Sequence, residues 1–146
     1  MGARDSNPSC SAWILRGPTA IREANEIVRL YSLEVGLVPD DQAKLSIVVE
    51  ELMANLYDHG GVQHHDEVEL TLSVGSRGIN LVLVDPGSPF DARKVRPKQR
   101  RTTSGAGAGT HLVRSWTEFV EYRVEVGRNR LELNFPPATG ATSYAK

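Results

Sequence analysis

The sequence has only one cysteine, almost no net charge and no long apolar run. Cys10 is the single cysteine among 146 residues, which excludes an internal disulfide bond and fits a reducing compartment. The formal net charge of −1 argues against the positive field typical of nucleic-acid-binding proteins. No apolar run approaches the roughly 18 residues of a membrane span, and residues 1–10 contain no apolar signal region. We therefore expect a cytoplasmic protein that binds neither nucleic acid nor membrane directly.

The order of the sequence patterns predicts one α+β domain. We expect a flexible N-terminus at residues 1–9, a folded domain at 10–136 and a disordered tail at 137–146. Within the domain the patterns run strand, helix, helix, strand, strand, long loop, helix, strand, strand. Because hairpins dominate this order, we expect a two-layer α/β sandwich, with helices on one face of a mixed but mostly antiparallel sheet.

Turn and cap residues place the boundaries of these elements. Gly36 ends the first helix, and Asp40 is the candidate N-cap of the second. The run 79–85 is apolar nearly throughout, which predicts a central strand. We expect the third helix over 109–117 and a hairpin turn at 127–128.

Three polar residues spaced four apart interrupt the apolar pattern of the second helix: Glu51, Asn55 and His59. On an α-helix they share one face, and Asn55 lies about 60° from the core residue Leu52. A carboxylate and an amide at a core edge are costly unless they are satisfied. An amide oxygen suits Mg²⁺, and a carboxylate one turn earlier can accept a proton from an attacking hydroxyl. A solvated helix face is the alternative that this pattern leaves open.

Asp85 ends the central strand, and Gly87 follows two residues later. A carboxylate at a buried strand end can accept a hydrogen bond from an exocyclic amine such as that of adenine. A glycine beside it lets a flat base approach the backbone. The alternative is an ordinary Asp-Pro-Gly turn that stops the strand.

Gly105, Gly107 and Gly109 alternate along the segment that leads into the third helix. Unpaired N–H groups and the dipole at a helix N-terminus favour phosphate. The segment is not a P-loop, because no Gly-Lys-Ser/Thr follows, and it lacks the spacing of the dinucleotide fingerprint. A flexible hinge is the alternative here.

In their order and spacing, these three segments resemble the motifs of the histidine-kinase-like ATPases. They are most similar to the small anti-sigma-factor serine/threonine kinases of bacterial partner-switching systems. The second helix matches the family's asparagine box, residues 85–91 match the first glycine box with its Pro-Phe-Asp ending, and residues 107–114 match the second. The resemblance covers residues 10–136 and implies the Bergerat ATP-binding fold.

The resemblance also implies a role for each matching residue. Asn55 would hold Mg²⁺ against the ATP phosphates, Asp85 would bind the adenine amino group, and Glu51 would be the catalytic base. Residues 88–108 would form a lid over the nucleotide. The implied nucleotide-binding residues are Asn55, His59, Asp85, Gly87, Arg101, Gly105, Gly107, Gly109 and Thr110.

Two functions agree with the resemblance. One is a Mg²⁺-ATP-dependent serine/threonine kinase that acts as an anti-sigma factor and phosphorylates a STAS-type anti-anti-sigma protein. The other is an ATP-binding protein-interaction switch of the same fold with little or no phosphoryl transfer. A sigma factor or another regulatory protein would be the second partner, and a homodimer is an expected assembly because relatives commonly dimerise. Glu51 discriminates between the two functions, since only the kinase requires it.

Overall fold

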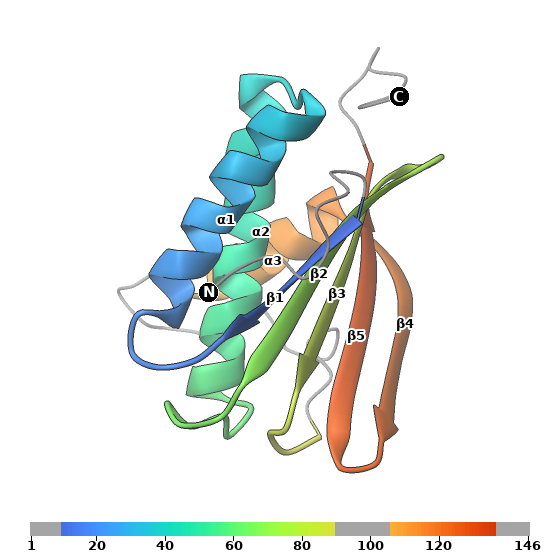
Figure 1. The fold of residues 1–146 in the computed structure, drawn as a ribbon. Coiled ribbons are helices and arrows are strands. Elements are labelled where there is room, and N and C mark those ends of the chain that lie inside the picture. Colours follow the sequence, from blue (N-terminus) through green and yellow to red (C-terminus); the bar gives the residue numbers. More distant parts are fainter. Residues whose placement is uncertain (1–9, 90–105, 137–146) are drawn as a thin grey trace.

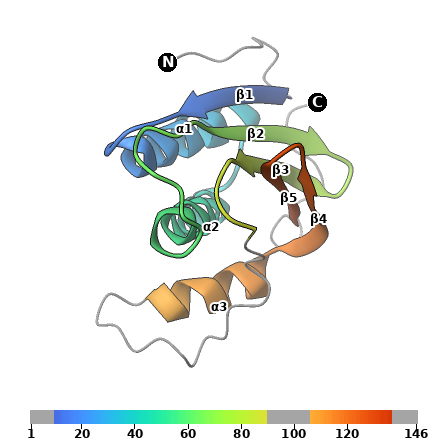
Figure 2. The same ribbon diagram turned by 90° about the horizontal axis from the view of Figure 1, so that it is seen from below.

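The protein folds as two layers, a five-stranded sheet and a layer of helices (Figures 1 and 2). The computed structural model describes residues 10–89 and 106–136, with the backbone alone for 106–110. The predicted α+β class and element order are confirmed, and no helix in the described ranges is long and apolar enough to span a membrane. The elements are β1 (Cys10–Leu15), α1 (Ala20–Val35), α2 (Pro39–Asp58), β2 (Val68–Gly75), β3 (Gly78–Asp85), α3 (Ala106–Trp116), β4 (Glu118–Glu125) and β5 (Arg128–Phe135).

The sheet has the strand order β1-β2-β3-β5-β4, and every neighbouring pair is antiparallel. β3 lies in the middle of the sheet, as its nearly continuous apolar sequence predicts. The expected mixture with parallel strands does not occur among the described strands. The reason is that β4 enters at the far edge, and its hairpin returns β5 beside β3.

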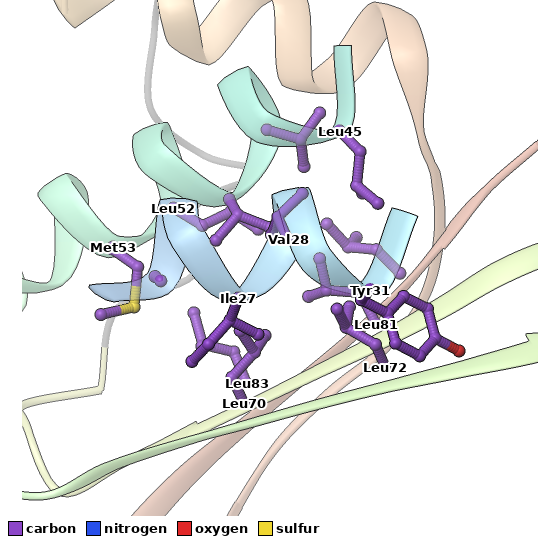
Figure 3. Close-up of a cluster of buried hydrophobic side chains, with 14 of the residues drawn as sticks. Ile27, Val28, Tyr31, Leu45, Leu52, Met53, Leu70, Leu72, Leu81 and Leu83 are labelled. Atoms are coloured by element: carbon purple, nitrogen blue, oxygen red, sulfur yellow. The ribbon is translucent and has the colours of Figure 1, made fainter. Parts of the chain in front are cut away.

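α1 and α2 bury their apolar stripes against the inner face of the sheet, and α3 packs beside α2 (Figures 2 and 3). The α2 stripe predicted from helical spacing is confirmed, because Leu45, Val49, Leu52 and Leu56 are all buried. Burying each large apolar side chain contributes roughly 2 kcal/mol. This core holds the second half of α2 in a fixed position over the end of β3. The core residues labelled in Figure 3 are Ile27, Val28, Tyr31, Leu45, Leu52, Met53, Leu70, Leu72, Leu81 and Leu83.

The start of α2 differs from the prediction. Pro39 is the first helical residue, and Val38 takes the N-cap place with an extended backbone and no side-chain cap hydrogen bond. The prediction of Asp40 as the N-cap is therefore wrong. The fixed φ of proline suits the first helical position, which moves Asp40 into the first turn. There its carboxylate lies 3.3 Å from the Lys44 Nζ and still faces the positive end of the helix dipole.

α3 begins three residues earlier than predicted, at Ala106, so Gly107 and Gly109 belong to the helix. The low helix propensity of glycine explains why the sequence pattern predicts the later start. At its other end, the single residue Thr117 separates α3 from β4. The Thr117 N–H and hydroxyl both donate to the Val113 carbonyl, at 3.0 and 2.6 Å. The helix therefore continues almost directly into the edge strand.

The β4–β5 hairpin turns at Val126 and Gly127, one residue earlier than predicted. Both residues have positive φ, 49° for Val126 and 75° for Gly127, which is the pattern of a type I′ turn. Asparagine and glycine favour this turn, whereas a β-branched residue is strained in it. Val126 is also 99% exposed, so no packing compensates for the strain.

We expect Val126→Asn to stabilise the protein by about 1 kcal/mol, because asparagine tolerates the left-handed backbone that valine does not. Thermal and urea unfolding of both proteins would measure the change. Val126→Thr is the matched control, since threonine is polar but still β-branched. An equal gain from threonine would show that removal of exposed apolar surface, and not backbone strain, causes the effect.

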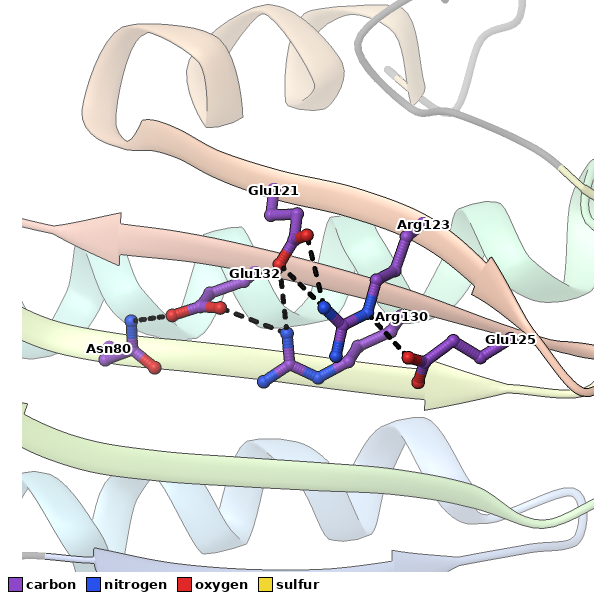
Figure 4. A network of polar contacts seen from close by, with 6 residues as sticks. All are labelled: Asn80, Glu121, Arg123, Glu125, Arg130 and Glu132. Atoms are coloured by element: carbon purple, nitrogen blue, oxygen red, sulfur yellow. Dashed lines mark hydrogen bonds and ion pairs between the residues drawn. The ribbon is translucent and has the colours of Figure 1, made fainter.

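The outer face of β3, β5 and β4 carries a network of polar contacts on the side away from the helices (Figure 4). Asn80 donates to the Glu132 Oε2 at 2.9 Å, and Arg130 lies 3.1 Å from the Glu132 Oε1. Arg123 lies 3.2 Å from Glu121. Each exposed pair contributes little to stability, but together they keep this face polar.

Candidate functional site

A hollow opens on the inner side of the sheet, between α2, the end of β3 and the β4–β5 hairpin. The space around its lining residues is about 310 Å³ when open solvent is included, so the hollow itself is smaller. Its wall is apolar apart from one polar residue each from α2, β3, β4 and β5, the usual form of a small-molecule site. The residues that line this α2–β3 hollow are Leu52, Asn55, Leu56, Leu83, Asp85, Tyr122, Asn129 and Leu131.

The second half of α2 carries the two polar residues predicted to face a ligand. Asn55 is 4% exposed and Glu51 is 9% exposed, so the solvated-face alternative is wrong for both. Asn55 lines the hollow, and its side chain makes no hydrogen bond within the described residues. The Asn55 amide atoms are not among the fully buried polar atoms that lack a partner, so they are open to the hollow, where a ligand can reach them. Glu51 lies one helical turn earlier and does not line the hollow among the described residues.

His59 does not continue the polar row of α2. It lies at the C-cap, is exposed, and its backbone N–H donates to the Asn55 carbonyl at 2.8 Å. Because the helix ends at Asp58, helical spacing no longer places the His59 side chain beside Asn55. Among the described residues, His59 is therefore not part of the hollow.

Asp85 ends β3 and is 4% exposed. Its Oδ1 accepts hydrogen bonds from the Gly87 N–H at 2.8 Å and from the Asn129 Nδ2 at 3.0 Å. Burial raises the pKa of the Asp85 carboxyl, and these two hydrogen bonds oppose the rise. Both bonds to Asp85 within the described residues end on Oδ1, which leaves Oδ2 for an external donor.

Gly87 is required by a close approach of two loops. A Cβ at this position would lie 2.3 Å from the Gly60 carbonyl oxygen and 2.9 Å from the Val62 Cγ2. The neighbouring Ser88 N–H donates to the same Gly60 carbonyl at 2.7 Å. The sequence predicts that Gly87 makes room for a base, but the space taken by a side chain here belongs to the loop after α2. This contact fixes the end of β3 against the end of α2.

Two residues of the hollow were not predicted from the sequence, Asn129 on β5 and Tyr122 on β4. Asn129 lies opposite Asp85 in the β3–β5 ladder and is 4% exposed. The Tyr122 hydroxyl donates to the Asn129 Oδ1 at 2.9 Å. A signal was available, because strand alternation places Asn129 on the same inward face as Leu131 and Leu133.

The glycine-rich segment is described only in part. Arg101 and Gly105, and the predicted lid over residues 90–105, lie outside the described residues. Gly107, Gly109 and Thr110 lie in the first turns of α3, which packs beside α2 (Figure 2). The first N–H groups of a helix have no acceptor within that helix, and phosphate binding by this segment stays a prediction.

Comparison with known proteins identifies the family. The chain matches the histidine kinase-like ATPase domain over residues 16–135. It is also similar to the serine/threonine-protein kinase RsbT of Bacillus subtilis (strain 168), with 32% identity over 88 residues. That match covers 59% of this chain and 65% of RsbT, less than two thirds of the relative's length. The chain belongs to the histidine kinase-like ATPase domain family, as its three motifs predict.

Proposed function

We propose that the α2–β3 hollow binds the nucleoside of ATP. The observation that carries this proposal is the convergence of two buried polar groups, the Asn55 amide and the Asp85 carboxylate, on one largely apolar hollow. An ATPase domain implies ATP as the cofactor, which supports it. In this proposal the Asp85 Oδ2 accepts a hydrogen bond from the adenine amino group, while Leu52 and Leu131 supply apolar contact to the base.

Asn55 is the residue that would hold Mg²⁺ beside the phosphates. The described residues contain no group of three His, Cys, Asp or Glu side chains that could hold a metal ion by themselves. Mg²⁺ commonly takes only one or two protein ligands and completes its shell with water and phosphate oxygens. The Asn55 amide, buried and without a hydrogen bond in the described residues, fits that requirement. When bound, the ion neutralises phosphate charge.

The proposed activity is a serine/threonine kinase with a STAS-type anti-anti-sigma protein as substrate, acting as the anti-sigma factor of a partner-switching system. Similarity to RsbT, a serine/threonine-protein kinase by name, supports the kinase class. Glu51 would accept the proton of the attacking serine hydroxyl, because it is the buried carboxylate one turn from Asn55. The alternative is the ATP-binding switch without phosphoryl transfer. It needs the residues of the hollow but not Glu51, which does not line the hollow among the described residues.

We expect Asn55→Ala to weaken Mg²⁺-ATP binding at least about tenfold, because the variant removes the buried oxygen ligand and leaves an apolar wall. Calorimetric titration of Mg²⁺-ATP into both proteins measures the loss. Titration with ATP in EDTA separates the metal contribution, and in EDTA the two proteins should bind with similar affinity.

Asn25→Ala is the matched control for this experiment. Asn25 also lies on a helix, α1, but its Nδ2 pairs with Glu50, away from the hollow. This control should bind Mg²⁺-ATP like the wild type. Absence of ATP binding by the wild type would overturn the proposed function, whereas equal binding by wild type and Asn55→Ala would overturn only the role of Asn55.

A further inference from the structure

The Asn129 side chain joins Asp85, the loop that follows it and β4. Its Nδ2 donates to the Asp85 Oδ1 at 3.0 Å and to the carbonyls of Gly87 and Ser88, both at 3.1 Å. Its Oδ1 accepts from the Tyr122 hydroxyl at 2.9 Å. An amide nitrogen has only two hydrogens, so three acceptors share them. Both polar atoms of the amide therefore have partners inside the protein.

This arrangement decides which oxygen of Asp85 faces a ligand. The Gly87 N–H and the Asn129 amide both bind Oδ1, so the carboxylate is held in one orientation with Oδ2 left for the hollow. The same amide holds the two carbonyls that follow Asp85. The loop is fixed from its other side by the Gly60 carbonyl, which accepts from the Ser88 N–H.

We propose that Asn129 is a positioning residue for base recognition, which holds the Asp85 carboxylate in the orientation that binds the amino group of adenine. The inference rests on the proposed ATP site and goes further, because it assigns the selectivity for a 6-aminopurine to a side chain whose polar atoms are bonded within the protein. Tyr122 supports this role by holding the amide oxygen, which keeps the amide nitrogen directed at Asp85.

The charges around Asp85 give this role a pH signature. Burial raises the pKa of the Asp85 carboxyl, and the negative charge of Asp66 before β2 also raises it. The hydrogen bond from Asn129 and the positive charge of Arg128 on β5 lower this pKa. Among the described residues of α2 and β4, the polar groups that line the hollow are the neutral Asn55 amide and the Tyr122 hydroxyl. Removing the Asn129 donor should raise the pKa further, so the carboxylate would become protonated at a higher pH than in the wild type.

The test compares ATP with inosine triphosphate, which carries a 6-oxo group in place of the 6-amino group. Calorimetry would give both affinities for the wild type and for Asn129→Ala. We expect the preference for ATP to fall about tenfold in the variant, because Asp85 is no longer held in its acceptor orientation. As the pH is lowered, the ATP affinity of the variant should begin to fall at a higher pH than the ATP affinity of the wild type does.

Asn80→Ala is the matched control. Asn80 makes the same kind of contact between the same two strands, an amide to the Glu132 carboxylate at 2.9 Å, but on the outer face of the sheet (Figure 4). It should keep both the wild-type preference for ATP and the wild-type pH profile. Equal loss of preference in Asn80→Ala would show a general weakening of the sheet and overturn the proposal.

Tyr122→Phe keeps the proposal testable if Asn129→Ala does not fold. It removes only the hydroxyl that holds the Asn129 oxygen, and we expect a smaller loss of ATP preference in the same direction. An unchanged ATP-to-inosine-triphosphate ratio in a folded Asn129→Ala, or in Tyr122→Phe if that is the variant measured, would overturn the role of Asn129. Failure of the wild type to bind ATP would instead overturn the proposed function.

Discussion

Glu51→Gln is expected to lower phosphoryl transfer by about 10² to 10⁴-fold while it leaves ATP binding intact, because the amide cannot accept the proton of a serine hydroxyl. Glutamine keeps the shape of this buried side chain and one acceptor oxygen, so the fold should be retained. The measurement is transfer of labelled phosphate from ATP to a purified STAS-domain protein of the same genome. ATP affinity would be determined in parallel.

Glu50→Gln provides the matched control, since Glu50 is the preceding carboxylate but is exposed and pairs with Asn25. It should transfer phosphate at the wild-type rate. If Glu51→Gln transferred phosphate as fast as Glu50→Gln, the assignment of Glu51 as the base would be wrong. ATP binding without transfer by any of the three proteins would favour the switch over the kinase.

Gly87→Ala should destabilise the protein by about 3 kcal/mol, the upper range for overpacking. The added methyl group would meet the Gly60 carbonyl, a backbone atom that cannot move without breaking its hydrogen bond to Ser88. We expect the midpoint of thermal unfolding to fall by roughly 10 °C. ATP affinity should fall as well, because Asp85 is held by the N–H of Gly87.

Gly75→Ala separates this contact from a general effect of replacing glycine. A Cβ at Gly75 would lie 3.7 Å from the Gly78 carbonyl, an ordinary contact, and Gly75 has no positive φ. Its unfolding midpoint should stay close to that of the wild type. Similar destabilisation by both substitutions would mean that the approach of Gly60 is not the cause.

The elements of the fold follow from local sequence patterns. Helical spacing in α2 and the continuous apolar run of β3 each depend on neighbouring residues only, and the structure confirms both. Boundaries were less predictable where propensity and packing disagree. Proline displaced the expected cap of α2, and glycines were included in α3 despite their low propensity.

The site was predictable only where its residues stand in a motif. Asn55 and Asp85 lie in such motifs and line one hollow, as expected for groups that share a ligand. Asn129 joins the hollow through a contact between β3 and β5, across 44 residues of sequence. Nothing in the local pattern gives the partner of a strand, so its link to Asp85 became visible only in the folded sheet.

The single residue between α3 and β4 limits how this protein can vary. The N–H and the hydroxyl of Thr117 both donate to the Val113 carbonyl. An inserted residue here would therefore break the helix end or shift the register of the edge strand. That register sets the place of Tyr122 beside Asn129. Length variation among relatives should therefore avoid this junction and collect in exposed connections such as residues 63–65, where no strand pairing depends on chain length.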